Sequence, residues 1–263
     1  MTTPEIYTKD TLITALRNIR DRGWIQGTRP GNAGSIGNTL EDLLGIQENN
    51  LPLPNAAEWE LKCQRLQTSS LTTLFHLEPS PTALKFVSNL LLPYYGWTHK
   101  EAGKKYPMTE KSFRQTISTK NRSDRGFKVV VDTQQEKILI SFDALTVSPK
   151  HQAWLQQVDC AIGLGEINPQ PYWGFDDFYH KAATKLHNCF FVGAMHKKIN
   201  GIEHFHYTKI LMLKNFSKRR LINAVESADI LVDFDARTGH NHGTKFRFRN
   251  NRLHELYDDV TEL

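Results

Sequence analysis

Hydrophobic and polar residues follow two periods along the chain, one typical of helices and one typical of strands. Apolar residues three or four apart predict helices at residues 9–22, 81–92, 149–158, 174–187 and 217–227. Alternation, or a short apolar run, predicts strands at residues 57–63, 71–76, 127–131, 137–142, 189–195, 202–213, 229–234 and 244–248. A further short helix is expected to begin at Thr39, with Asp42 as its capping partner, and to end at Gly45.

Helices and strands are interspersed along the whole chain. This order favours an α/β or α+β fold with a mixed central β-sheet flanked by helices. The connections are evenly structured, and no clear linker divides the 263 residues. We therefore expect one domain over residues 1–263; the pattern also admits two lobes with a cleft, without a readable boundary between them.

The composition is ordinary for a globular protein, with 39% hydrophobic and 23% charged residues. No apolar run approaches the length of a membrane span, and MTTPEIYTKD at the N-terminus does not have the pattern of a signal peptide. The cysteines, Cys63, Cys160 and Cys189, are scattered and odd in number, which argues against a disulfide framework and a thiolate zinc site. We expect a reducing, cytoplasmic environment and no membrane partner.

The charge distribution is more informative than the net charge of +5, which comes from 33 basic and 28 acidic residues. One basic cluster lies between Lys111 and Lys128, where Asp124 is the only acidic residue. A second cluster near the C-terminus consists of Lys245, Arg247, Arg249 and Arg252. Such clusters suit a polyanionic partner, although a run of like charges is more often only a solvated surface.

Candidate chemistry lies in the stretch LPNAAEWELKCQR, residues 53–65. Alternation along the predicted strand puts Glu60 and Lys62 on one face and Trp59 and Leu61 on the other. A carboxylate is a hard ligand for a divalent metal, and a nearby ammonium can orient water or neutralise a phosphate. Strands also often carry such a pair on a solvent-exposed face, and the tripeptide alone favours that interpretation.

Three blocks of sequence favour the catalytic interpretation of Glu60 and Lys62 over the surface pair. They are GNAGSIGNTLEDLLGI, NNLPLPNAAEWELK and HNHGTKFRF. In this order they resemble the MvaI/BcnI-like type II restriction endonucleases, which are related to the mismatch-repair nicking enzyme MutH. The resemblance runs from the first predicted helix to about residue 250. It implies a PD-(D/E)xK nuclease fold with catalytic and DNA-recognition lobes and a Mg²⁺ cofactor.

The resemblance also implies how such an enzyme works. The partner is double-stranded DNA, and one active site of a monomer cuts the two strands in separate events. The enzyme belongs to a prokaryotic restriction-modification system with a cognate DNA methyltransferase, which it need not contact.

Carried over by position, the resemblance assigns catalytic roles to Glu41, Glu60 and Lys62, and metal binding to Glu60. The metal-binding aspartate of the family falls on Asn55, so the sequence departs from the pattern there. An asparagine offers one neutral oxygen and no charge, and metal binding and water activation should both suffer. Our hypothesis is a disarmed nuclease, through an engineered or a natural Asp-to-Asn change; Glu58 is a weaker candidate for a substitute carboxylate.

Residues that read DNA are also implied by the resemblance. Arg247, in the strand after the HNHG loop, falls on a guanine reader, and Arg237 lies near the position of a second. Each could instead contact a phosphate or lie on the surface. Arg29 and Asn32 lie in the glycine-rich loop, which could approach the DNA backbone or minor groove or could simply lead into the helix.

Three histidines bear on the central base pair of the target. In the BcnI-like branch one histidine near His76 and another in the HxHG loop read that pair, so His76 with His240 or His242 favours the target CC(C/G)GG over the A·T-centred target of the MvaI-like branch. His76 could equally be satisfied within the sheet. A metal site from His240 and His242 lacks a third ligand nearby in the sequence, and adjacent His-Asn-His is not an HNH nuclease motif.

Two other functions stay open at this point. A MutH-like nicking enzyme would share the catalytic motif but depend on partner proteins and hemimethylated sites. In a catalytically inert DNA-binding module Asn55 would simply reflect the lack of catalysis. Such a module would bind DNA tightly, specifically and in a salt-dependent manner.

Overall fold

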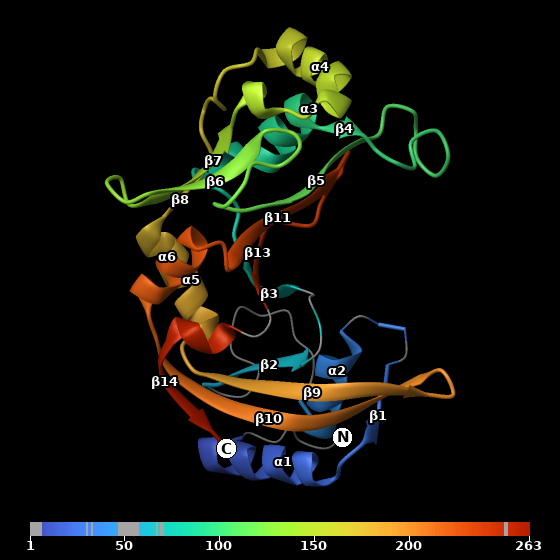
Figure 1. Cartoon of the computed structure of the whole chain (residues 1–263), viewed down its shortest axis with the longest axis vertical. Coiled ribbons are helices and arrows are strands. Elements are labelled where there is room, and N and C mark those ends of the chain that lie inside the picture. Colours follow the sequence, from blue (N-terminus) through green and yellow to red (C-terminus); the bar gives the residue numbers. More distant parts are fainter. Residues whose placement is uncertain are drawn as a thin grey trace. The chain divides into compact units, whose positions relative to one another are not determined.

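The computed structural model describes residues 7–29, 31–32, 34–46, 58–66, 68, 71–249 and 252–263 (Figure 1). The chain forms two compact units, and it passes between them several times. Unit 1 comprises Met1–Thr72, Ala182–Arg220 and Arg249–Leu263, and unit 2 comprises Thr73–Lys181 and Leu221–Phe248. Among the described helices, none is long and apolar enough to cross a membrane.

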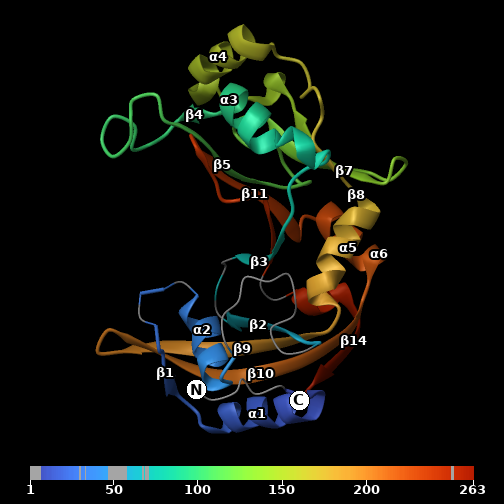
Figure 2. The ribbon, with the colours of Figure 1, turned by 180° about the vertical axis from the view of Figure 1, so that it is seen from behind.

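Unit 1 is built on a mixed five-stranded sheet in the order β1-β10-β9-β2, with β14 paired to β10. The strands are β1 (Ile25–Gln26), β2 (Glu60–Arg65), β9 (Cys189–Ile199), β10 (Ile202–Phe216) and β14 (Tyr257–Glu262). β2 runs parallel to β9, and the other pairs are antiparallel. Figure 2 shows β14 beside the end of β10 from behind. In the described part of the unit, β2 is the last strand of this order.

The predicted hairpin around KKING is confirmed, with longer strands than expected. β9 and β10 pair from Cys189↔Leu213 to Ile199↔Ile202. Asn200 and Gly201 occupy the turn with positive φ angles of 50° and 80°. Both central residues of a tight hairpin turn of this kind need the left-handed region, which Asn and Gly adopt at low cost.

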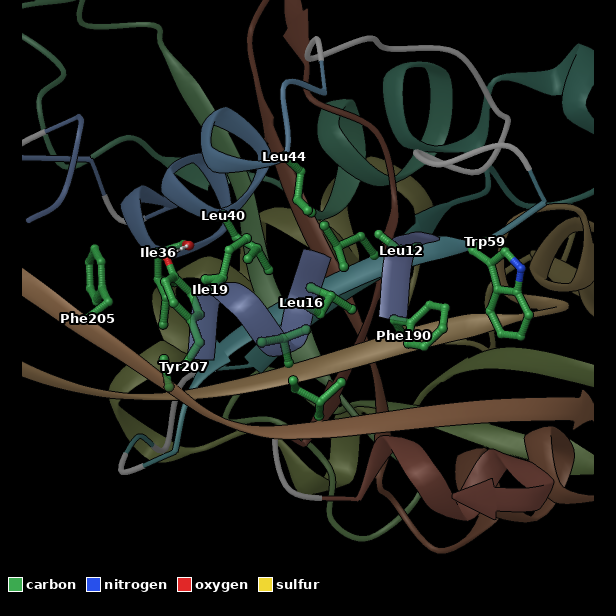
Figure 3. Close-up of a cluster of buried hydrophobic side chains, with 14 of the residues drawn as sticks. Leu12, Leu16, Ile19, Ile36, Leu40, Leu44, Trp59, Phe190, Phe205 and Tyr207 are labelled. Atoms are coloured by element: carbon green, nitrogen blue, oxygen red, sulfur yellow. Dashed lines mark hydrogen bonds between the residues drawn. The ribbon is translucent and has the colours of Figure 1, made fainter. Parts of the chain in front are cut away.

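Two helices, α1 (Lys9–Asp21) and α2 (Ser35–Leu43), cover one face of this sheet. Their apolar side chains form a single core with residues of β2, β9 and β10 (Figure 3). The helices contribute Leu12, Leu16, Ile19, Ile36 and Leu40, and the strands contribute Leu61, Phe190, Val192, Phe205, Tyr207 and Ile210. The helical spacing at residues 9–22 therefore predicted α1 correctly, because one stripe of that helix is buried.

The predicted start of α2 is wrong, because the helix begins at Ser35 rather than at Thr39. Thr39 is buried and accepts a hydrogen bond from the Thr28 amide (3.1 Å), and Asp42 accepts one from the Thr28 hydroxyl (2.5 Å). These side chains thus hold the preceding loop on the helix and do not form a capping box. Glu41 consequently lies in the second turn of α2 rather than in the first.

Unit 2 contains the six-stranded sheet β3-β13-β11-β5-β4, with β12 paired to β11, and the three-stranded sheet β6-β7-β8. The strands of the larger sheet are β3 (Leu71–His76), β4 (Trp97–Thr98), β5 (Lys111–Ile117), β11 (Ile230–Arg237), β12 (His240–Asn241) and β13 (Lys245–Arg249). Those of the smaller sheet are β6 (Phe127–Asp132), β7 (Lys137–Phe142) and β8 (Tyr172–Gly174). The mixed sheet expected from the sequence is therefore one of several sheets.

The remaining helices are α3 (Leu92–Tyr95), α4 (Gln152–Ile162), α5 (Phe175–Leu186) and α6 (Lys218–Glu226). The helix predicted at residues 81–92 is instead a 3-10 turn at Thr82–Leu84, a π-helical turn at Val87–Leu91 and then α3. β5 was not predicted, because the exposed Lys111 and Arg114 and the adjacent buried Ser112 and Phe113 interrupt a regular alternation.

Burial of Leu40 links α2 to the sheet of unit 1, and its side chain is 0% exposed. We expect Leu40→Ala to lower the free energy of unfolding by roughly 2–5 kcal/mol, because it leaves a cavity in a close-packed core. Urea unfolding followed by tryptophan fluorescence measures this loss. The matched control is Leu145→Ala, since Leu145 is 96% exposed and its truncation should change stability by less than about 0.5 kcal/mol. Equal effects of the two substitutions would contradict the described core.

Candidate active site

Glu60 and Lys62 lie on β2, and the alternating apolar residues next to them are buried, as the sequence predicted. Leu61 belongs to the core beneath α1 and α2, and Trp59, just before the strand, is part of the same core. Glu60 and Lys62 therefore project from the opposite face of the sheet. Register with β9 aligns Glu60 with Cys189 and Lys62 with Phe191 on that face.

Glu60 is almost completely buried, with 1% of its side chain exposed. One of its carboxylate oxygens, Oε1, lies 2.6 Å from Lys62 Nζ and 3.7 Å from Lys185 Nζ. The other oxygen, Oε2, is buried and has no hydrogen-bond partner among the described residues. A buried charge without partners is costly, so the two ammonium groups are what makes a carboxylate tolerable here.

Lys185 is a member of this site that the sequence did not reveal. It lies in the last turn of α5, far from β2 in the chain. The sequence signal was a lysine near the C-terminus of a predicted helix, a common place for a cation because of the helix dipole. Only the tertiary fold connects that position with Glu60.

Cys189 lies beside the pair and does not add a nucleophile to it. Burial raises the pKa of its thiol to about 12, the positive charge of Lys62 lowers it, and the negative charge of Glu60 raises it. The thiol is therefore protonated at neutral pH, and a thiol rather than a thiolate is a poor nucleophile. The chemistry of this face depends on Glu60 and the two lysines.

The other predicted members of the site are placed differently. Asn55 lies outside the described residues. Glu41 lies on α2, where its negative charge acts on the thiol of Cys63. Burial raises the pKa of that thiol, and the charge of Glu41 raises it further. Glu58 is exposed. Within the part of the chain that the structure describes, no three His, Cys, Asp or Glu side chains are grouped as a metal ligand set.

A second set of predicted residues lies on one face of the larger sheet of unit 2. Along β11, buried residues alternate with the half-exposed Asp233, Asp235 and Arg237. Neighbouring strands add cations to this face, which we call the basic sheet face. Its cations are Arg114, Arg237, Lys245 and Arg247.

The aspartates of β11 hold these cations in place. Asp235 accepts hydrogen bonds from Arg114 Nε (2.7 Å) and Lys245 Nζ (3.1 Å). Burial raises the pKa of Asp235, but the hydrogen bonds and the positive charges of Arg114 and Lys245 together lower it below its usual value. Arg247 Nη1 lies 3.4 Å from Asp233 Oδ2. The face thus presents cations whose positions are fixed by partly buried aspartates.

Arg237 is held from two sides. Its Nη1 lies 3.0 Å from the buried carboxylate of Glu110, and its guanidinium lies 4.7 Å from the centre of the Tyr106 ring. Both partners belong to the segment between β4 and β5. Arg237 therefore anchors that segment to β11, which gives it a structural role whether or not it contacts DNA.

The predicted histidines gather around the HNHG loop. The rings of His240 and His242 are perpendicular, with their centres 4.3 Å apart. His76, at the end of β3, adjoins the same loop, because a Cβ added to Gly243 would lie 3.2 Å from His76 Cδ2. Gly243 has a φ of +81°, so a side chain there would also strain the backbone.

Glu78, which sequence reasoning missed, fixes this loop. It accepts hydrogen bonds from the Thr244 amide (2.9 Å) and the Thr244 hydroxyl (3.2 Å). The Leu77 amide donates to the Thr244 carbonyl at 3.0 Å, which continues the link. The signal in the sequence was weak, since Glu78 lies in the irregular stretch LEPSP after the predicted strand.

Arg29 and Asn32 have local partners in unit 1. Arg29 Nη2 lies 2.9 Å from Asp42 Oδ1, and Asn32 Oδ1 accepts a hydrogen bond from the Gly34 amide at 2.8 Å. The Thr28 hydrogen bond lowers the pKa of Asp42, burial raises it, and Arg29 lowers it further, with a net decrease. These contacts organise the entry into α2.

A carboxylate and a lysine on one face of a strand provide a hard oxygen ligand for a metal and a positive charge beside it, which suits metal-dependent phosphodiester hydrolysis. Site-specific deoxyribonuclease is the class that this fold and sequence define. The chain belongs to the MvaI/BcnI restriction endonuclease family, whose sequence profile matches residues 13–257.

Two solved structures are similar in fold. One is described as a restriction endonuclease MvaI–cognate DNA substrate complex, with 22% identity and a TM-score of 0.75 over 97% of this chain and 99% of that chain. The other, restriction endonuclease MvaI in the absence of DNA, has 23% identity and a TM-score of 0.56 over 100% of this chain and 99% of that chain. These likenesses confirm the expected PD-(D/E)xK fold. No curated protein sequence matches the chain.

Glu78→Ala should open the HNHG loop, because it removes acceptors from the Thr244 amide and hydroxyl. We expect amide hydrogen exchange across residues 240–244 to speed up by an amount that corresponds to roughly 1–3 kcal/mol of local stability. The matched control is Asp132→Ala, since Asp132 accepts from the Gln134 and Gln135 amides in the β6–β7 turn. Unchanged exchange in Glu78→Ala, or equal loosening of the loop in the control, would contradict the assignment.

Proposed function

We propose that this member of the family is a Mg²⁺-dependent endonuclease that recognises a short CCNGG-type site, with CC(C/G)GG as the target, and that its Asn55 impairs cleavage. The observation that carries the proposal is the ion pair between the buried Glu60 and the partly exposed Lys62 on the last strand of the sheet. A surface ion pair on a solvated face would not be 1% exposed on its acidic side. This burial argues against the interpretation of Glu-x-Lys as an ordinary surface pair.

Enzymes of this family use a divalent metal, and Glu60 fits one. Its buried Oε2 lacks a hydrogen-bond partner among the described residues, and a hard carboxylate oxygen of this kind is a preferred ligand of Mg²⁺. In the proposed site Glu60 and the residue at position 55 would hold the ion, which would supply positive charge for the phosphate and activate a water.

The chain's own residues have separate roles in this proposal. Lys62 orients the attacking water or neutralises the scissile phosphate, with Lys185 as a second positive charge beside Glu60. Glu41 is proposed as a further catalytic residue, because it falls on a catalytic position of the family pattern. Asn55 contributes one neutral oxygen, which binds a cation more weakly than a carboxylate does.

Double-stranded DNA is the proposed partner, a proposal supported by the cognate DNA substrate in the MvaI complex of similar fold. Arg247 is proposed to read a guanine, with Arg237 nearby, because both belong to a face whose cations are held by acids. His76 with His240 or His242 is proposed to read the central base pair, since all three adjoin one loop. Arg29 and Asn32 are proposed to approach the backbone or the minor groove.

The proposed enzyme acts as a monomer with one active site, which nicks the strands one after the other, and a cognate methyltransferase protects the host's sites. Asn55 favours a second candidate, an inert sequence-specific DNA-binding module, because it removes a charge that metal binding needs. The experiment below distinguishes the two.

Asn55→Asp should restore or strongly increase plasmid cleavage in Mg²⁺, because it returns a second carboxylate to the metal. Adding Lys62→Met to this variant should abolish cleavage and leave DNA binding nearly intact. Gel analysis of nicked and linear plasmid, followed by sequencing of the ends, measures the rate, the order of the cuts and the target. Binding without cleavage by Asn55→Asp would favour the inert module, and cleavage only with partner proteins at hemimethylated sites would favour a MutH-like enzyme.

Arg247→Ala should relax or destroy specificity, at a cost of roughly 1–3 kcal/mol at one guanine position. Competition binding against duplexes with single base changes measures the cost. The matched control is Arg17→Ala, since Arg17 is exposed on α1. A loss that is uniform across all sequences would make Arg247 a phosphate contact instead.

A further inference from the structure

A cavity of about 250 Å³ lies in unit 1 beside the candidate active site. Its lining includes Gln64 from β2, Phe191 from β9 and Lys209 from β10. Arg249 and His254, from the C-terminal part of the chain, also line it. No catalytic or DNA-reading role proposed above uses any of these residues.

The strand register puts this cavity on the face that carries Glu60 and Lys62. Gln64 alternates with Lys62 and shares its face. Phe191 is aligned with Lys62, and Lys209 is aligned with Gly193, the partner of Gln64. Two residues along a strand span about 7 Å, so the cavity begins roughly one phosphate-sized group away from Lys62.

The charge of the lining is one-sided. Basic side chains line the cavity, and none of the lining residues that the structure describes is acidic. Lys209 forms no ion pair with any described residue, whereas Arg65 is held at 3.0 Å by Glu203, which does not line the cavity. A concave site with cations and no lining acid attracts an anion, and low-dielectric walls strengthen that attraction.

Part of the lining is apolar, which suits a ligand larger than a bare ion. Phe191 and Leu211 pair across β9 and β10 and are 8% and 5% exposed. A lining that combines apolar and basic side chains matches a group with a carbon-rich body and an anionic end. A deoxyribose with its phosphate has this chemistry, whereas a free inorganic anion would use only the basic side chains.

We propose that this cavity binds a sugar-phosphate unit of the DNA strand that is being cut, next to the scissile phosphate. Lys209 and Arg249 contact the phosphate, and the sugar lies against Phe191 and Leu211. The inference rests on the proposed function and adds to it an anchor that sets the position of the strand relative to Lys62. A phosphate contact positions the DNA and carries no sequence information. Its loss should therefore weaken the binding of all DNA sequences by the same factor.

The test uses the chain as given, without divalent cation, and a duplex that contains the target. Single methylphosphonate substitutions are moved along each strand, and affinity is measured at fixed salt. We expect one position to weaken binding roughly tenfold in the chain as given and to have no effect in Lys209→Gln. The salt dependence of Lys209→Gln should be shallower by about one phosphate contact.

Two variants complete the design. Lys9→Gln is the matched control, since Lys9 lies on α1, on the opposite face of the sheet, and should leave affinity and the methylphosphonate pattern unchanged. Lys209→Arg keeps the charge and should retain binding, which separates a lost contact from a misfolded cavity. Thermal unfolding of each variant checks the fold.

Each outcome decides the question. If the methylphosphonate effect persists in Lys209→Gln, the DNA phosphate lies elsewhere and the proposal is wrong. If Lys209 instead governs binding of inorganic phosphate, measured by titration, without any coupling to a DNA position, the cavity is a free-anion site and the proposal is also wrong. If the chain binds no DNA at all, the proposed function fails first, which is a distinguishable result.

Discussion

Unit 1 depends on one constraint, the burial of a carboxylate on an edge strand. Glu60 is 1% exposed, and a charge in that position needs opposite charges close by. Lys62 comes from the same strand, and Lys185 comes from the end of α5. The site therefore requires β2 to be in register with β9 and α5 to end beside it. A slip of one residue in β2 would exchange Glu60 for Leu61 and place the charge in the apolar core.

The basic sheet face of unit 2 follows the same logic with the signs reversed. Asp233 and Asp235 are partly buried and hold Lys245 and Arg247 on β13 and Arg114 on β5. These ion pairs reduce the charge that the face can offer to a polyanion, and they fix the directions of the side chains. Fixed directions favour specificity over simple attraction, since a preorganised guanidinium loses less entropy on binding.

Local patterns predicted the elements whose burial is regular. Such patterns are the apolar stripe in residues 9–22, the hairpin turn at Asn200 and the alternation around Glu60. In each of them the sequence pattern follows directly from the burial or the backbone conformation of the same residues. Where a side chain's partner comes from elsewhere in the chain, the pattern failed. Thr39 holds Thr28 instead of capping a helix. Lys185 and Glu78 have roles that only tertiary contacts create, which no spacing in the sequence could indicate.

The charge balance of the proposed site explains what a neutral residue at position 55 changes. On the sheet face that carries Glu60, its carboxylate faces the ammonium groups of Lys62 and Lys185, and with Asn55 these side chains carry an excess of positive charge. Glu41 is not counted here, because it lies on α2, which covers the other face of the sheet. Such a site attracts a phosphate and repels a divalent cation. An aspartate at position 55 would balance the charges and favour the cation. On this argument one substitution shifts the proposed site from cleaving DNA to holding it, because phosphate binding gains from the charge that metal binding loses.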